Sequence, residues 1–184
     1  MRLLAGVFLV LWAVLPALAG ELAGVMLPDQ VQVEGQRLEL NGMALRKVVF
    51  FKVYVGGLYL PEAMGDGQQI LAADTERQVV MHFLRNLKGA ELSEAWMDGL
   101  KANTPEASPE VRLQFETLCA WMSDVVEGDR LVVTYMPGMG TRIEVRDEVL
   151  GVLPGKPFGD ALFACWIGPN PGPGKAFRKA MLGG

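Results

Sequence analysis

The chain has 184 residues, of which 51% are hydrophobic and 21% charged, and its formal net charge is −4. An acidic chain without a basic run is a poor nucleic-acid binder, so we expect no nucleic-acid partner, and it offers no polybasic segment for anionic lipid. The chain contains one histidine and two cysteines. It shows neither a cofactor motif nor a cluster of metal ligands, so we expect no cofactor and no metal.

The first nineteen residues have the pattern of a secretory signal peptide. Arg2 is the only charge before Glu21, an apolar stretch follows it, and Ala17-Leu18-Ala19 places small residues at the −3 and −1 positions of a cleavage site. The stretch is shorter than the ~20 apolar residues that span a bilayer. We therefore expect residues 1–19 to be removed. Residues 20–184 would then form a single exported domain, periplasmic or secreted, without stable membrane insertion.

The first half of this domain predicts mainly strands. Residues 31–40 alternate between apolar and polar side chains and end at Asn41-Gly42, which is a typical turn pair. Residues 47–60 contain the densest β-strand signal of the chain. A short helix over 68–73 and a strand over 77–84 follow, the latter with alternate apolar residues on one face.

Helical periodicity begins in the second half. Two helices, three short strands and two further helices are predicted in that order. The stripes that define the first three of these helices are Leu92, Trp96 and Leu100; Val111, Phe115, Leu118 and Met122; and Phe158, Leu162 and Trp166. The predicted strands cover 130–135, 142–145 and 149–153, and the last helix covers 175–182. Strands and helices that are segregated, without β-α-β alternation, indicate an α+β domain on a mostly antiparallel sheet.

The two cysteines of the chain, Cys119 and Cys165, both lie in apolar helical patterns. Export permits a disulfide between them. A free cysteine, however, often packs as a small buried hydrophobic residue. The sequence leaves both states open.

Two stretches of the sequence form a set that is uncommon outside one family. The first contains Leu40-Asn-Gly-Met-Ala-Leu-Arg46, Phe51-Lys-Val-Tyr54 and Gly57-Leu-Tyr-Leu60, and the second ends in Ala164-Cys-Trp-Ile-Gly168. With the order of elements between them, they resemble the chalcone-isomerase-like family over roughly residues 31–183. The resemblance implies an open-faced β-sandwich, in which helices cover one face of a large, mostly antiparallel sheet.

This family has a branch that cyclises chalcones and a branch that binds fatty acids or has no known activity. Arg46 matches the arginine of the enzymes, whereas Tyr54 stands where they have threonine, as in the fatty-acid-binding branch. The tyrosine and asparagine that the enzymes place on the next helix fall near Leu92 and Gly99, and Cys165 replaces a threonine or serine. Ring closure needs polar groups that stabilise a developing enolate oxygen. Leucine and glycine supply none, so the resemblance disfavours cyclisation.

Arg46 and Tyr54 together suit a carboxylate. A guanidinium group forks a carboxylate in two parallel hydrogen bonds, and a tyrosine hydroxyl adds a third. If residues 47–53 formed one straight strand, the two side chains would lie roughly 26 Å apart at ~3.3 Å per residue. A site that uses both therefore requires a tight turn near Val49-Phe50.

We predict a non-catalytic carrier or sensor of the cell envelope that binds a small amphipathic acid, such as a fatty acid, between sheet and helices. Arg46 and Tyr54 would hold the carboxylate. One alternative is an isomerase acting on a conjugated, enone-like substrate, with Arg46 as electrophile and Tyr54 as acid. Another is an interaction module without a ligand. A deep apolar cavity with one polar end would favour the carrier. The residues predicted to line the tail site are Phe50, Leu92, Trp96 and Trp166.

Overall fold

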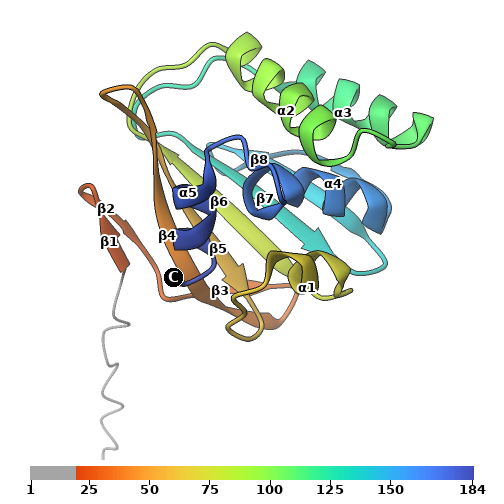
Figure 1. The fold of residues 1–184 in the computed structure, drawn as a ribbon, viewed down its shortest axis with the longest axis horizontal. Helices are drawn as coiled ribbons and strands as arrows, with labels where there is room; N and C mark the ends of the chain where they lie inside the picture. Colours follow the sequence, from red (N-terminus) through yellow and green to blue (C-terminus); the bar gives the residue numbers. More distant parts are fainter. Residues whose placement is uncertain (1–19) are drawn as a thin grey trace, which may run out of the picture.

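Residues 20–184, the part of the chain that the computed structural model describes, form a seven-stranded antiparallel sheet and a separate two-stranded hairpin. The predicted signal peptide lies outside these residues. The large sheet is a meander, because its strand order follows the sequence (Figure 1). Its strands are β3 (Gln30–Val33), β4 (Gln36–Val48), β5 (Phe51–Leu60), β6 (Arg77–Phe83), β7 (Arg130–Met136), β8 (Gly140–Val145) and β9 (Glu148–Leu153).

Five helices of residues 20–184 gather on one face of this sheet (Figure 1). They are α1 (Gly67–Ala72), α2 (Gly89–Asn103), α3 (Pro109–Trp121), α4 (Lys156–Ile167) and α5 (Lys175–Met181). None of the helices in the described part of the chain is both long and apolar enough to cross a membrane. The predicted α+β class, with a large antiparallel sheet and helices on one face, is confirmed.

The opposite face of the sheet has its own, smaller apolar cluster. A short hairpin, β1 (Gly20–Leu22) and β2 (Val25–Leu27), lies beside β4 on that side. Neighbouring residues of a strand point to opposite faces, so Val25 and Leu27 of β2 point into the cluster while Met26 between them is exposed. The buried residues of this second cluster are Val25, Leu27, Val33, Leu38, Val55, Tyr59, Val80 and Met136.

The predicted turn at Asn41-Gly42 is wrong, because β4 runs through both residues. The Asn41 amide donates to the carbonyl of Met181 at 2.9 Å and accepts from the backbone N–H of Met64 at 2.7 Å. A Cβ on Gly42 would lie 2.2 Å from the carbonyl oxygen of Ala180 in α5. These residues therefore hold the C-terminal helix against the strand, and the chain turns earlier, at Glu34-Gly35, where both φ angles are positive.

Residues 47–60 form parts of two strands and not one. β4 ends at Val48 and β5 begins at Phe51, with Val49 and Phe50 between them. Val49 adopts a φ of 53°, which a β-branched residue rarely does. The sequence hid this turn because two-residue turns favour glycine, asparagine or aspartate.

A buried arginine connects the helical layer to the sheet. The Arg77 side chain is fully buried, and it donates to the carbonyls of Ile70 at 3.1 Å and Ala73 at 3.2 Å. It also pairs with the Asp160 carboxylate of α4 at 2.5 Å. Its guanidinium carbon lies 4.4 Å from the centre of the Tyr135 ring. This single side chain therefore joins α1, α4 and β7.

Candidate functional site

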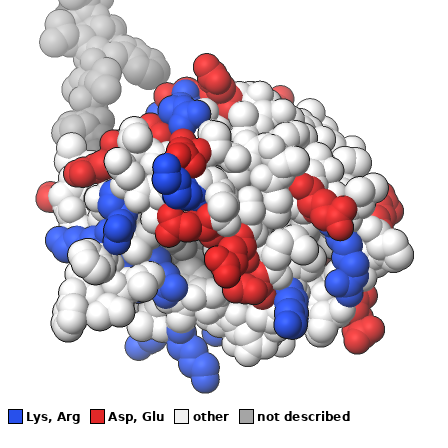
Figure 2. All heavy atoms as spheres, turned by 90° about the horizontal axis from the view of Figure 1, so that it is seen from above, with Lys and Arg blue, Asp and Glu red and all other residues white. Residues whose placement is uncertain are grey.

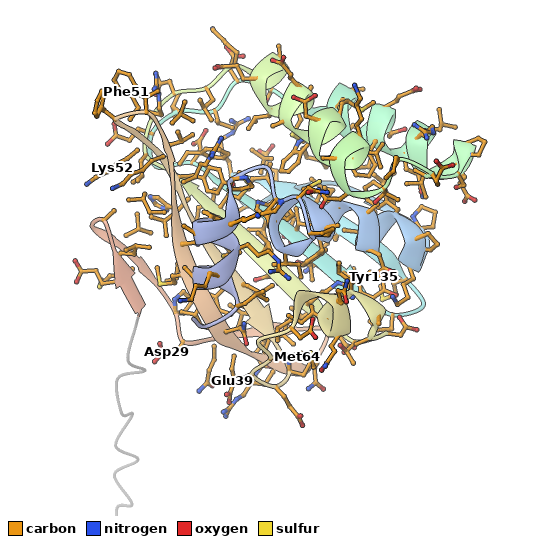
Figure 3. All side chains as sticks on the ribbon, in the orientation of Figure 1. Asp29, Glu39, Phe51, Lys52, Met64 and Tyr135 are labelled. Atoms are coloured by element: carbon orange, nitrogen blue, oxygen red, sulfur yellow. The ribbon has the colours of Figure 1, made fainter. Side chains whose placement is uncertain are left out.

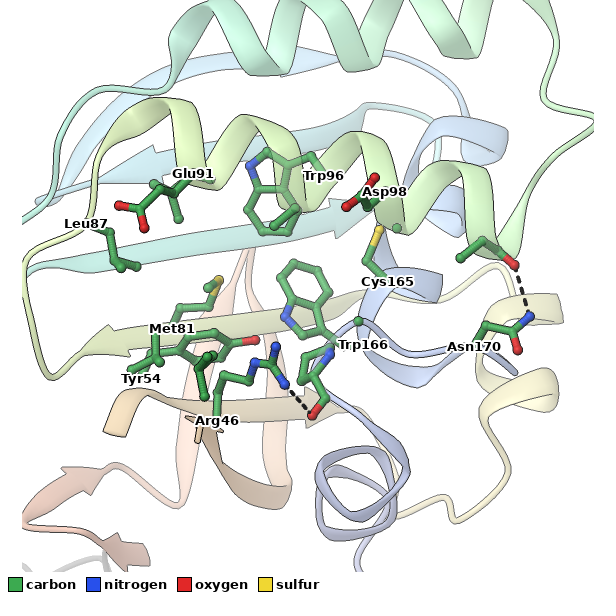
Figure 4. A pocket seen from close by; sticks show the side chains of 18 residues that line it. Arg46, Tyr54, Met81, Leu87, Glu91, Trp96, Asp98, Cys165, Trp166 and Asn170 are labelled. Carbon is green, nitrogen blue, oxygen red and sulfur yellow. Dashed lines mark hydrogen bonds between the residues drawn. The ribbon is translucent and has the colours of Figure 1, made fainter. Parts of the chain in front are cut away.

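A cavity of about 380 Å³ lies between the sheet and helix α2. This volume is within the range of small-molecule sites, roughly 300–1,000 Å³. Its walls come from the turn end of the β4–β5 hairpin, from β6 and the loop that follows it, from α2, from the end of α4 and from the loop that follows α4. Figure 4 shows the side chains around it.

The tight turn at Val49-Phe50 brings the two predicted head-group residues together. Arg46 of β4 and Tyr54 of β5 are direct partners across the hairpin. The register shifts between Arg46 and Lys47, so the two strands are bent at this point. Both side chains line the cavity, and the tyrosine hydroxyl and the guanidinium group face each other in Figure 4. The geometric condition for a shared carboxylate site is met.

The Arg46 guanidinium group is held in place by a backbone carbonyl, but no acidic side chain of residues 20–184 neutralises its charge. Its Nη1 donates to the carbonyl oxygen of Pro173 at 2.9 Å, which fixes the side chain against the loop after α4. Within residues 20–184, no aspartate or glutamate pairs with it. A half-buried cation without an acidic partner attracts an anion, because a charge in an apolar site is stabilised mainly by pairing.

Tyr54 supplies a neutral hydroxyl beside this cation. The residue is 7% exposed and packs edge-on against the rings of Phe83 at 6.1 Å and Phe177 at 5.6 Å. Burial raises the pKa of the Tyr54 hydroxyl above its ordinary value, while the nearby Trp166 and Arg46 side chains partly oppose the rise. The group therefore stays protonated at neutral pH, as a hydrogen-bond donor to an anion.

The remaining wall of the cavity is largely apolar. Leu92, Trp96 and Trp166, which the sequence predicts as tail contacts, all line it, and each is at most 5% exposed. The rings of Trp96 and Trp166 meet edge-on, 5.3 Å apart. The buried indole N–H of Trp96 has no hydrogen-bond partner among the described residues. Sequence reasoning missed further apolar wall residues, among them Val53, Met81 and Leu87.

The prediction that Phe50 lines the tail site is wrong. Phe50 is 91% exposed, at the tip of the β4–β5 hairpin. Since the chain reverses at Val49-Phe50, this side chain points away from the domain, and Val53 takes its place in the wall.

Gly99 and Cys165 belong to the wall of the cavity where α2 meets α4. A Cβ on Gly99 would lie 2.5 Å from the sulfur of Cys165, so only glycine lets α2 approach α4 this closely. Cys165 is 4% exposed, and burial raises the pKa of its thiol to about 12. It is therefore a poor nucleophile at neutral pH. Both cysteines, Cys119 and Cys165, are free thiols in the structure.

The mouth of the cavity runs along helix α2. Glu91, Ala95, Asp98 and Ala102 all belong to its lining and all are exposed. Their spacing of four, three and four residues places them on one stripe of the helix. The two small residues leave the mouth open, and the two carboxylates lie at its rim in water.

Together, the fold and this cavity define an α+β domain that encloses a small apolar site with one cationic end. Residues 19–183 match the chalcone isomerase-like family, and the chain belongs to this family. No curated protein sequence is significantly similar to the chain.

Among solved structures, the chain is similar to a fatty-acid binding protein of Arabidopsis thaliana. The two share 13% sequence identity and superpose with a TM-score of 0.69 over 86% of this chain and 92% of the other. At this identity, the similarity establishes the fold.

Proposed function

We propose that this protein is a non-catalytic carrier or sensor that binds a small amphipathic acid, such as a fatty acid, in the α2 cavity. The carboxylate is held by the Arg46 guanidinium group and the Tyr54 hydroxyl. The acyl chain lies against the apolar wall formed by Met81, Leu92 and Trp96.

The observation that carries the proposal is the cation at one end of an apolar cavity. Arg46 has a backbone partner in Pro173 but no acidic partner within residues 20–184, and its neighbour Tyr54 is a protonated donor. A carboxylate would accept charge-assisted hydrogen bonds from both the Arg46 guanidinium group and the Tyr54 hydroxyl. A neutral apolar ligand would leave the cation half-buried and without a counter-charge, which costs free energy.

The structural similarity to a plant fatty-acid binding protein supports the same ligand class. Proteins that share a fold can bind different ligands. The support for a fatty acid therefore has to come from the site as well as from the fold. In this chain, the site offers the one cation and one phenol that a carboxylate needs.

An isomerase acting on a conjugated substrate has less support. Such a reaction needs several polar groups that converge on the developing charge. Leu92 and Gly99 supply no polar side chain to the cavity, and the raised pKa of Cys165 makes its thiol a weak acid and nucleophile. An interaction module without a pocket also has less support, because a cavity of ligand size is present.

We place this function in the cell envelope, outside the cytosol. The support is the signal-peptide pattern of residues 1–19, with its basic start, apolar stretch and Ala17-Leu18-Ala19 end. N-terminal sequencing of the protein from an envelope fraction should find Gly20 or a close neighbour as the first residue. A protein from that fraction that begins at Met1 would contradict cleavage.

The test of binding is native mass spectrometry of the mature protein before and after a short-chain or medium-chain fatty acid is added. We expect a one-to-one complex that Ala95→Phe weakens at least tenfold, because the new ring fills the mouth of the cavity. Ala90→Phe is the matched control, since Ala90 is exposed on the same helix and outside the lining. Equal binding by both variants would place the acid elsewhere and refute the proposal.

A further inference from the structure

We propose that the tip of the β4–β5 hairpin is a docking element for an anionic lipid bilayer. The tip is defined here as residues 47–52. This inference rests on the proposed function and deepens it, because a bilayer is the source from which an envelope protein would take an amphipathic acid. Its physical basis lies in four features of the tip.

The first feature is a continuous group of exposed apolar side chains. Val49 is 78% exposed, Phe50 91% and Phe51 62%, and Val48 beside them is 46% exposed. Figure 3 shows Phe51 at the end of the hairpin, away from both apolar clusters of the domain. Single exposed apolar residues are ordinary, but four in a row on one protruding turn indicate an interaction site.

The second feature is the ring of positive charge around this group. Lys47 and Lys52 are direct partners across the two strands, and the Arg85 guanidinium carbon lies 5.0 Å from the centre of the Phe51 ring. Like charges directly opposite each other destabilise a hairpin. An apolar tip flanked by basic residues matches the interface of an anionic bilayer, where apolar side chains enter the acyl region and cations stay at the head groups.

The net charge of −4 does not oppose this contact, because charges beyond about 8–10 Å are screened at physiological ionic strength. Figure 2 looks down on the end of the molecule that carries the tip. Basic side chains stand among uncharged atoms at its lower left, whereas acidic side chains form a run across the middle. The charge of the contact surface, and not that of the whole chain, decides the local attraction.

The third feature is the backbone of the turn. Val49 holds a φ of 53°, where glycine or asparagine would be free of strain. Neither Val49 nor Phe50 packs on the domain, so the fold gains nothing from these two bulky residues. Strained residues that the fold does not need often mark functional sites.

The fourth feature is the position of the tip relative to the cavity. Val48 both lines the cavity and belongs to the exposed apolar group, and Arg46 lies two residues before it on the same strand. Leu87, from the loop after β6, also lines the cavity. A bilayer in contact with the tip would therefore lie next to the ligand site.

The experiment is co-flotation of the mature protein with vesicles of phosphatidylglycerol or of phosphatidylcholine, without added fatty acid. We expect binding to phosphatidylglycerol that falls with added salt, and much weaker binding to phosphatidylcholine. Val49→Gly/Phe50→Asn should reduce vesicle affinity at least tenfold while the thermal midpoint stays equal or rises, since glycine relaxes the first turn position. Lys47→Gln/Lys52→Gln should reduce it about 25-fold, at about fivefold per basic residue.

The controls are Leu113→Ser, which removes another exposed apolar residue, and Lys101→Gln/Lys175→Gln, which removes two exposed lysines elsewhere. Both should bind vesicles as the wild type does. Equal losses in control and tip variants, or no binding to phosphatidylglycerol, would overturn the inference. A dimer in sedimentation that Val49→Gly/Phe50→Asn dissociates would also overturn it, because the tip would then bind a second copy. Fatty-acid binding in solution is measured separately, so either idea can fail alone.

Discussion

Replacement of Arg46 by alanine is the perturbation that the site predicts most specifically. The variant removes the only cation whose guanidinium group lines the described cavity, together with its hydrogen bond to the Pro173 carbonyl. The charge-assisted bidentate contact as a whole contributes about 1.5–3 kcal/mol, so the affinity for a fatty acid should fall roughly tenfold to a hundredfold. Arg46→Lys should recover part of the loss, because an ammonium group cannot fork a carboxylate. Tyr54→Phe should cost about 0.5–1.5 kcal/mol, since it removes one neutral donor.

Isothermal titration calorimetry with an acid and the alcohol of equal chain length measures this prediction. The wild type should prefer the acid, whereas Arg46→Ala should bind acid and alcohol equally, because the alcohol never used the charge. Thermal melting of each variant controls for loss of fold. An acid affinity that is unchanged in a folded Arg46→Ala protein would refute the reasoning.

Three further predictions concern the fold. Arg77→Met removes one of the two cationic partners of Asp160, which keeps Lys156, and it leaves the carbonyls of Ile70 and Ala73 without this donor. It should lower the free energy of unfolding by about 3 kcal/mol in urea titrations, and a loss below about 1 kcal/mol would contradict a connecting role. Burial lowers the pKa of His82, so below about pH 6.5 a proton binds the unfolded state before the folded state, and stability falls. In a series of thermal melts at different pH, His82→Gln should flatten the decrease of the melting temperature with falling pH. An unchanged decrease would exclude His82 as its source. Cys119 and Cys165 should both be alkylated in denaturant without reductant, and a disulfide mass would contradict this.

Most of the fold follows from local patterns in the sequence. The stripes of Leu92, Trp96 and Leu100 and of Phe158, Leu162 and Trp166 are helical faces that pack on the sheet, because apolar residues at three- and four-residue spacing must find a common partner. The strand at 77–84 was also predictable from alternation. The turns were not, since Asn41-Gly42 is held in a strand by α5, which lies far away in the sequence.

The head-group pair could be proposed from sequence, but its geometry could not. Arg46 and Tyr54 meet only because the chain reverses at Val49-Phe50, and that pair has no turn residue to announce it. Phe50 is apolar like the other predicted tail contacts, but its place in the turn puts it at the hairpin tip and not in the cavity. The Arg77 network was also hidden, because a buried cation is defined by partners from distant elements and not by its own neighbours.

The basic surface around the tip illustrates the same limit. Lys47 and Lys52 are separated by four apolar residues, and Arg85 comes from another strand end, so the sequence contains no basic run. The hairpin and the loop after β6 bring the three charges around one exposed aromatic group. A surface that is assembled from two segments becomes visible only in three dimensions.

The central claim is that Arg46 pairs with the carboxylate of a bound acid. Carbon-13 NMR of a carboxyl-labelled fatty acid in complex with the protein tests it most directly, because the chemical shift reports ionisation of the bound carboxyl group as pH is lowered. The account predicts that the bound carboxyl group stays ionised to lower pH than the free acid in the wild type. Arg46→Ala should raise the pKa of the bound carboxyl group above the free value, since the largely apolar site then has no cation. Identical titration curves for the wild type and Arg46→Ala would contradict the account.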